Sequence, residues 1–138
     1  MLSSKKETKR VSSDTLDNYS IYLKEINRYQ LLTSEEELTY SRKYKSGCID
    51  SRNKLIESNL RLVVKVANKY RNRNQRELTP LDIIEEGNLG LMKAVDRFDP
   101  ELGYRFSTYA VWWIKESIES ALFNHSRTVR LPVHITKE

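Results

Sequence analysis

Residues 103–116 read GYRFSTYAVWWIKE and hold five aromatic side chains, among them both tryptophans of the chain. No glycine or proline occurs from residue 104 to residue 131, so the stretch predicts a long helix. At about 100° per residue, one arc of this helix is small and apolar and is predicted to face the core. Its members are Ala110, Val111, Ile114, Ser117, Ile118 and Ala121. Trp112 and Glu116 point the other way, with Tyr109 close to them and Trp113 on the flank.

Two uses of these outward aromatic side chains are open. They either pack against a neighbouring helix or loop, or form a platform on which unpaired nucleobases stack, each base contributing about 1–3 kcal/mol. Arg105 and Lys115 lie beside them in the sequence and would contact phosphates, which favours the second use.

The composition fits one helical domain with a tail and favours a polyanionic partner. The 138 residues carry a formal net charge of +5. Only 4 glycines and 3 prolines, with long unbroken segments between them, indicate an all-α protein. The one cysteine, Cys48, excludes an internal disulfide and a thiolate metal site and fits a reducing cytoplasm. No apolar run approaches the roughly 18 residues of a membrane span, and the polar N-terminus is unlike a signal peptide.

The first thirty residues divide into a tail and a helix. Residues 1–13 are rich in Ser, Lys and Arg with almost nothing apolar, which predicts a disordered tail. The apolar pattern that follows predicts a first helix of about three to four turns, started by Ser13 or Asp14.

Two capping patterns mark later helix starts. Thr33-Ser34-Glu35-Glu36 is a capping box and predicts a helix to about Ser46, with Gly47 as its stop. Thr79-Pro80-Leu81-Asp82 places a capping threonine before a proline at the first helical position and an aspartate at the third. The helix that begins there is predicted to close at Phe98-Asp99-Pro100.

Between these two starts lies the longest apolar stretch, from Asp50 to Tyr70. Its apolar arc is too wide for a surface helix, which predicts a central one. Asn59 and Arg61 interrupt the arc, and Asn59 is either a capping or solvated residue or an amide that recognises a base. Arg71–Glu77 contains no apolar residue and predicts a basic loop.

The helix that begins at Thr79 has an acidic and an apolar face. Asp82, Glu85 and Glu86 share the first. The second consists of Ile83, Ile84, Gly87, Leu91 and Val95. The acidic face is either simply solvated or docks on a basic surface of a protein partner.

No motif supports catalysis, a cofactor or a metal. The glycines of Gly87-Asn88-Leu89-Gly90 lie inside a helical pattern and form no phosphate-cradling loop. His125 and His134 lack ligand spacing with carboxylates or Cys48. Without a nucleophile elbow either, we expect no enzymatic activity and no cofactor.

Four long motifs, in this order, resemble those of the bacterial sigma-70 family of transcription initiation factors. They are IESNLRLVV at 56–64, EGNLGLMKAV at 86–95, FSTYA with WWI at 106–114, and RTVRLP at 127–132. The similarity runs from about Asp14 to the last residue. Residues 84–90 and 130–138 most resemble the stationary-phase or general stress type, with housekeeping factors second. The resemblance implies a helical bundle that binds core RNA polymerase and melts promoter DNA.

The same resemblance implies which side chains hold the unpaired non-template strand of the promoter's minus-ten element. A flipped adenine would enter a pocket of Phe98, Tyr104, Phe106, Thr108 and Tyr109. Trp112 and Trp113 would act as a wedge that replaces the stacking lost at the fork, where unstacking a base costs a few kcal/mol. A flipped thymine would meet Asn59, Leu62 and Ser107, with Glu37 nearby.

Three further contact regions follow from the resemblance. The first helix would contact the discriminator just downstream through Tyr22, Leu23 and Lys24. Upstream phosphates and the extended minus-ten region would meet Arg127, Arg130, His134 and Lys137. The acidic residues that would dock on the coiled coil of the polymerase's largest subunit are Asp82, Glu85, Glu86 and Asn88.

Two of the departures from the family pattern concern residues beside the melted bases. Glu116 stands where a glutamine is usual and would favour a donor such as the amino group of cytosine, which puts the base specificity at that step in question. Leu102 stands where an arginine commonly supports the flipped adenine.

The resemblance also divides the chain. The expected parts are a disordered tail (1–13), a discriminator-contacting helical segment (14–48), a polymerase-binding and minus-ten-binding helical domain (49–126), and the start of an extended minus-ten segment (127–138). The segments that thread toward the polymerase active site and read the minus-thirty-five element are missing, so we expect a fragment or a truncated natural product. One other class of function stays open: a truncated interaction module that acts as a decoy for polymerase or for an anti-sigma regulator.

Overall fold

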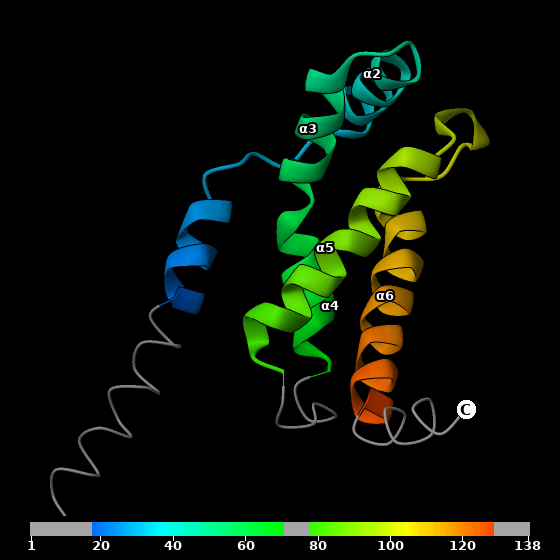
Figure 1. The fold of residues 1–138 in the computed structure, drawn as a ribbon. Helices are drawn as coiled ribbons and strands as arrows, with labels where there is room; N and C mark the ends of the chain where they lie inside the picture. Colours follow the sequence, from blue (N-terminus) through cyan, green and yellow to red (C-terminus); the bar gives the residue numbers. More distant parts are fainter. Residues whose placement is uncertain (1–17, 71–77, 129–138) are drawn as a thin grey trace, which may run out of the picture. The chain divides into compact units, whose positions relative to one another are not determined.

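The computed structural model describes residues 18–70 and 78–128, with side chains described as far as residue 124 (Figure 1). Within these ranges every regular element is helical, which confirms the predicted all-α class. The predicted tail (1–13), the predicted basic loop (Arg71–Glu77) and the start of the first helix lie outside the described residues.

The chain divides into two compact units, Met1–Gln30 and Leu31–Glu138. In the first unit, residues 18–26 are helical, as part of the predicted first helix. All of the later elements belong to the second unit. The functional division predicted between residues 48 and 49 is a different kind of boundary and stays a prediction.

Helix α2 (Ser34–Lys45) begins and ends as the sequence predicted. The Thr33 backbone N–H donates to Glu36 Oε1 at 3.0 Å, and the Glu36 N–H donates to Thr33 Oγ1 at 3.2 Å. This reciprocal pair satisfies two backbone amides that the first turn would leave unbonded. After the helix, Gly47 adopts φ +105°, a left-handed conformation that favours glycine and ends the helix.

The predicted central helix is in fact two helices, α3 (Ile49–Ser58) and α4 (Leu60–Asn68). The break is Asn59, whose side-chain Nδ2 donates to the Leu55 carbonyl at 2.7 Å and to Ser58 Oγ at 3.3 Å. In a continuous helix the Asn59 backbone N–H would use that Leu55 carbonyl, but here it bonds Ile56 O at 3.0 Å. The side chain therefore competes with the backbone ladder, and the prediction of one helix was wrong.

Helix α5 (Pro80–Arg97) starts at the predicted capping box, with the Asp82 N–H donating to Thr79 Oγ1 at 3.1 Å. Its buried side matches the predicted apolar face. The buried residues are Ile83, Ile84, Gly87, Gly90, Leu91, Ala94 and Val95. Phe98 ends the helix, and a short 3₁₀ turn, η2 (Pro100–Leu102), follows.

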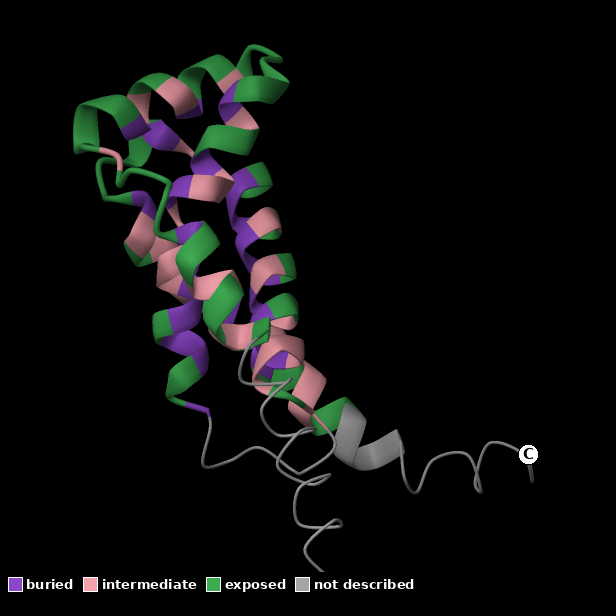
Figure 2. Ribbon diagram, turned by 90° about the vertical axis from the view of Figure 1, so that its left-hand side faces the viewer, coloured by how far each residue is buried: buried purple, intermediate pink, exposed green. Residues whose placement is uncertain are grey.

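Helix α6 (Phe106–Thr128) lies beside α5, and the buried residues of α4, α5 and α6 face one another in the core of this unit (Figures 1 and 2). Ala110, Ile114 and Ile118 are buried on the predicted face. Its other predicted members, Val111, Ser117 and Ala121, are half-buried at the edges. The prediction of an inward apolar face and an outward Trp112 is confirmed.

Gly90 allows α5 and α6 to approach closely. A Cβ atom at Gly90 would lie 2.5 Å from the Trp113 carbonyl oxygen and 3.0 Å from the Ile114 Cα. Both are backbone atoms of α6, so no side-chain rotation could relieve the clash. The absence of a side chain at Gly90 therefore sets the position of α6 at the level of Trp113.

The ranges 18–70 and 78–128 contain no helix long and apolar enough to cross a lipid bilayer. The same described segments bring no three His, Cys, Asp or Glu side chains together as metal ligands.

Candidate nucleic-acid interface

The aromatic cluster is a continuous set of ring contacts from the C-terminal end of α5 to the first half of α6. Its members are Phe98, Tyr104, Phe106, Tyr109, Trp112 and Trp113. Phe98 is the hub, with ring centroids 6.1 Å from Tyr104, 5.1 Å from Phe106 and 5.7 Å from Tyr109. The chain of contacts continues from Tyr109 to Trp113 at 6.3 Å and from Trp113 to Trp112 at 5.1 Å.

The aromatic cluster has a buried floor and an exposed surface. Phe106 and Phe98 are buried, whereas Tyr104 is 41% exposed and Trp112 is 59% exposed. Tyr109 and Trp113 are half-buried between them. The phenylalanines therefore pack in the interior, whereas the other rings offer faces or edges to solvent. The use of these exposed rings as a stacking platform for unpaired bases stays a prediction. Phe98 and Phe106 can support a bound base only from beneath.

The tryptophan pair is held in a defined geometry. The Trp112 and Trp113 rings are edge to face, with an interplanar angle of 88°. The Arg97 guanidinium lies 4.9 Å from the Trp113 ring centroid, a cation–π distance. Sequence reasoning missed Arg97, because a basic residue in the last turn of a helix is usually explained by the helix dipole alone. The one feature of the sequence that could have indicated Arg97 is its position directly before Phe98.

A cavity of about 300 Å³ collects the residues predicted to hold the thymine. Its lining includes Asn59, Leu62, Ser107 and Glu37, contributed by the α3–α4 break, α4, α6 and α2. The remaining lining residues are Leu31, Leu32, Ser58, Arg61, Lys65 and Arg105. Three of these are cationic, so the cavity combines an amide, a hydroxyl and an apolar side chain with positive charge.

The amide nitrogen of Asn59, which lines this cavity, is already hydrogen-bonded within the protein. Nδ2 donates to Leu55 O and Ser58 Oγ within α3. These bonds leave the amide carbonyl oxygen as the group that can accept a hydrogen bond from a base. Asn59 thus has a structural use, ending α3, and still presents an acceptor to the cavity.

Glu37 is a buried carboxylate that joins α2 to the start of α6. Its Oε2 accepts the Phe106 backbone N–H at 2.9 Å and Arg105 Nε at 3.2 Å. A carboxylate at this position also complements the positive end of the α6 dipole. The prediction placed Glu37 near the thymine; the structure places it in the cavity wall, with its oxygens already bonded to α6.

A second, smaller cavity of about 180 Å³ is also lined by Glu37 and Arg105. It extends to the aromatic cluster through Phe98 and Tyr104. The other lining residues are Ser34, Leu38, Pro100 and Gly103. Of the residues predicted for the adenine pocket, the structure therefore brings two to this cavity, whereas Thr108 is exposed on α6 nearby.

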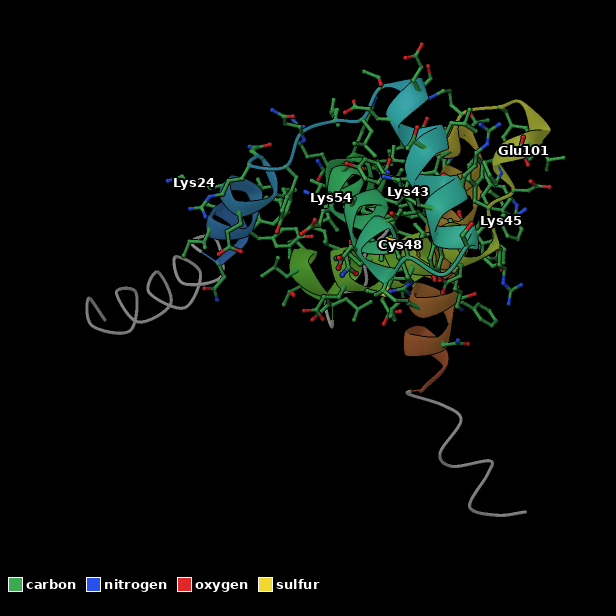
Figure 3. The ribbon with its side chains drawn as sticks, turned by 90° about the horizontal axis from the view of Figure 1, so that it is seen from above. Lys24, Lys43, Lys45, Cys48, Lys54 and Glu101 are labelled. Atoms are coloured by element: carbon green, nitrogen blue, oxygen red, sulfur yellow. The ribbon has the colours of Figure 1, made fainter. Side chains whose placement is uncertain are left out.

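Ion pairs fasten α2 and α3 to the segment that carries the aromatic cluster. Arg42 Nε bonds Glu101 Oε1 at 2.7 Å, and Lys45 Nζ lies 3.3 Å from Asp99 Oδ1. Figure 3 shows the Lys45 side chain on the side of α2 that faces η2, where Glu101 lies. The Arg42 hydrogen bond lowers the pKa of the Glu101 carboxyl, and the Glu101 backbone N–H, followed by Lys45, lowers the pKa of Asp99.

Asp96 receives two more of these contacts. Arg52 Nε bonds Asp96 Oδ1 at 2.8 Å, and the Tyr44 hydroxyl donates to the same oxygen. The Arg52 hydrogen bond holds the pKa of Asp96 below its ordinary value, and the Tyr44 hydroxyl adds to this effect. The hydrogen bond to Asp96 in turn raises the pKa of the Tyr44 hydroxyl.

The predicted docking residues lie on α5 as expected, with Glu85 exposed and Asp82, Glu86 and Asn88 half-buried. Beside them, a groove of about 730 Å³ runs between α5 and α6. Glu86, Glu116 and Trp113 all line it. The acidic face and the aromatic cluster are therefore not separate surfaces but meet along this groove.

The remaining predicted contact residues fall elsewhere. Tyr22 and Leu23 are half-buried and Lys24 is exposed in the first compact unit. Lys115 is half-buried on α6, and Leu102 is exposed at the end of η2. The Arg127 side chain and the predicted contacts at Arg130, His134 and Lys137 lie outside the described residues.

Comparison with known families gives two matches in the order that the motifs suggested. Residues 55–128 match the model of Sigma-70 region 2, and residues 17–47 match that of Sigma-70 factor, region 1.2. The first match contains α4, α5, α6 and the whole aromatic cluster.

Several named proteins are similar to the chain. RNA polymerase sigma factor RpoS of Coxiella burnetii is 53% identical over 96% of this chain, and SigA of Listeria monocytogenes is 46% identical over 88%. SigA4 of Synechococcus elongatus is 43% identical over 93%. These alignments cover 37%, 32% and 47% of the relatives, so the chain spans about a third to a half of their length.

Proposed function

Because this chain belongs to the sigma-70 family, we propose that it binds core RNA polymerase and recognises and melts the minus-ten element of promoters in the cytoplasm. The observation that carries this proposal is Trp112, a large ring 59% exposed on a helix whose opposite side is the core. Exposing an indole is unfavourable in water, and its rigid edge-to-face contact with Trp113 suits it to replace a base pair at a fork.

Strand capture in this proposal is a binding reaction without bond chemistry. An adenine that leaves the duplex loses its stacking, which costs a few kcal/mol, and regains it on Tyr104 and Tyr109 above the buried Phe98. Arg97 and Lys115 supply positive charge beside the rings. Binding energy for the extruded base shifts the duplex toward the open state.

A second extruded base, the thymine, occupies the cavity that includes Asn59, Leu62 and Ser107. The Asn59 carbonyl oxygen accepts from the ring N–H of the base, and Leu62 packs against its face. The cations at this cavity, Arg61 and Lys65, meet the phosphates of the same strand.

Docking on core polymerase uses the acidic face of α5. Asp82, Glu85 and Glu86 present negative charge from one side of a helix, which complements a basic coiled coil. Asn88 adds a polar group to the same face. The higher identity to the RpoS relative than to the SigA relatives supports assignment to the stress type.

The test compares Trp112→Ala with Phe123→Ala, an equally exposed aromatic position (58%) on the same helix. Each variant, bound to core polymerase, is titrated with an unpaired minus-ten strand in an electrophoretic mobility shift assay. We expect Trp112→Ala to weaken strand binding by about tenfold or more, because one stacking surface is lost, and Phe123→Ala to change it less than about twofold.

Polymerase affinity is measured in parallel by competition. Equal losses of polymerase binding and strand binding in Trp112→Ala would refute the assignment of the aromatic cluster to DNA. If the unaltered chain binds polymerase but adds nothing to strand binding, the interaction-module function is the correct one.

A further inference from the structure

The cavity proposed to hold the thymine shares a wall with the smaller cavity that reaches Tyr104, one of the rings on which the adenine is proposed to stack. Glu37 and Arg105 line both the cavity of about 300 Å³ around Asn59 and the cavity of about 180 Å³ that reaches Tyr104. A strand that places one base in each cavity must therefore carry its backbone across this pair of side chains.

The wall is held from three parts of the second compact unit. Arg105 precedes α6, and its Nε bonds Glu37 Oε2 of α2 at 3.2 Å. Its Nη2 lies 3.4 Å from Glu37 Oε1 and 3.4 Å from the Leu32 carbonyl oxygen, which precedes α2. The Phe106 N–H holds the same carboxylate at 2.9 Å. The guanidinium therefore has little freedom to swing into either cavity.

The two side chains differ in exposure. The Glu37 side chain is 9% exposed, whereas that of Arg105 is 52% exposed. The carboxylate is thus the buried anchor, and the guanidinium stands at the rim with its positive charge toward solvent. A fixed cation at that point suits the phosphate that joins nucleotides on its two sides.

We propose that the Glu37–Arg105 pair is a rigid partition that sets the number of nucleotides between the two flipped bases. The proposal rests on the proposed function and adds to it that the adenine stacked on Tyr104 occupies the smaller cavity. Arg105 and Glu37 are positioning residues here: they do not read a base but fix the spacing at which two bases are read together.

The experiment measures spacing selectivity. The chain, bound to core polymerase, is titrated with unpaired strands in which the number of nucleotides between the adenine and the thymine changes one at a time. We expect the unaltered chain to favour one spacing by about tenfold over its neighbours, because a wrong spacing leaves one base outside its cavity. In Arg105→Ala this preference should fall to within about twofold, while Arg105→Lys, which keeps the charge, should retain part of it.

The matched control is Arg42→Ala, which breaks an Arg–Glu pair of the same type between α2 and η2. It should keep the tenfold selectivity. The spacing preference is a ratio of two affinities measured on the same protein. Unfolding of part of the protein lowers both affinities by the same factor, so general destabilisation cannot mimic the result. If Arg105→Ala binds too weakly to titrate, Glu37→Gln decides, since its amide oxygen still accepts the Phe106 N–H.

Two outcomes overturn the partition. Arg105→Ala and Glu37→Gln with unaltered selectivity would show that the pair does not set the spacing. No spacing preference in the unaltered chain, with binding that still requires the adenine, would do the same and leave the proposed function intact. If strand binding by the unaltered chain does not require the adenine, the proposed function itself is contradicted.

Discussion

At the scale of single residues, Asp96 connects three helices through one carboxylate. It belongs to α5, accepts from Arg52 of α3, and receives the Tyr44 hydroxyl of α2. The side chain is 43% exposed, so solvent weakens each contact and the net stabilisation is modest. Its importance is geometric, because it fixes the end of α5 next to Arg97 and Phe98.

Acid should remove this contribution. The pKa of Asp96 is lowered in the folded protein, so its stabilisation is fully present above the unfolded value of about 3.9 and is lost as pH falls through the lower folded value. We expect Asp96→Asn to be less stable than the unaltered chain at neutral pH, by less than about 1 kcal/mol. This difference should disappear as the pH falls below the ordinary Asp value and through the lowered folded value. Thermal unfolding across this range measures it.

Glu85→Gln, which also removes one carboxylate from α5 at an exposed position, is the control for the change in net charge. It should show no such convergence with the unaltered chain at low pH. A deficit of Asp96→Asn that persists unchanged in acid would mean that the ionised carboxylate is not the stabilising group.

At the scale of elements, the sequence predicted those features that are local. The capping boxes at Thr33 and Thr79 involve residues three apart, so both helix starts could be read directly. The break at Asn59 was predicted only as one alternative, a capping residue. The residues on both sides of Asn59 keep a helical apolar pattern, so the pattern alone did not show that the amide takes the Leu55 carbonyl. Glu37 was placed near the site, but its burial depends on the Phe106 N–H, 69 residues away.

The contact between α5 and α6 makes a second prediction. Alanine in place of an exposed helical glycine stabilises by about 1 kcal/mol. At Gly90 we expect the opposite, a loss of about 1–3 kcal/mol, because the new Cβ would lie 2.5 Å from the Trp113 carbonyl oxygen. Urea unfolding of Gly90→Ala measures the free energy of unfolding.

Glu85→Ala on the exposed side of α5 is the matched control and should change stability by less than about 0.5 kcal/mol. A stabilised Gly90→Ala variant would show that the two helices can separate at no cost, and that the glycine is not needed for their approach.

At the scale of the whole molecule, two proposed binding surfaces share one pair of helices. The acidic face of α5 and the aromatic cluster border the same groove, through Glu86 on one side and Trp113 on the other. The close contact at Gly90 holds these same two helices together. A partner that binds α5, as proposed, would therefore contact a helix whose position relative to α6, the helix proposed to bind the strand, is already fixed.

A charge reversal on the acidic face should affect polymerase binding and leave the fold unchanged. We expect Glu86→Lys to weaken binding to core polymerase by about tenfold or more, because it opposes a basic partner, while the helix content stays unchanged. Competition with the unaltered chain for polymerase, together with circular dichroism, measures both. Glu35→Lys, an exposed reversal on α2, should compete nearly as well as the unaltered chain.

Undiminished competition by Glu86→Lys would place the polymerase contact elsewhere on the molecule. A loss of helix content in the same variant would mean that half-buried Glu86 supports the fold. The polymerase contact would then be tested with Glu85→Lys, at an exposed position.

The pairing of Trp112 and Trp113 has a practical consequence. The chain contains only these two indoles, and they lie 5.1 Å apart in one cluster beside Arg97. Tryptophan fluorescence, excited at the long-wavelength edge of the protein absorption, is therefore emitted from this one cluster. The molecule carries an intrinsic optical reporter at the very surface where a nucleobase is proposed to stack, and its quenching can be followed without attaching a dye.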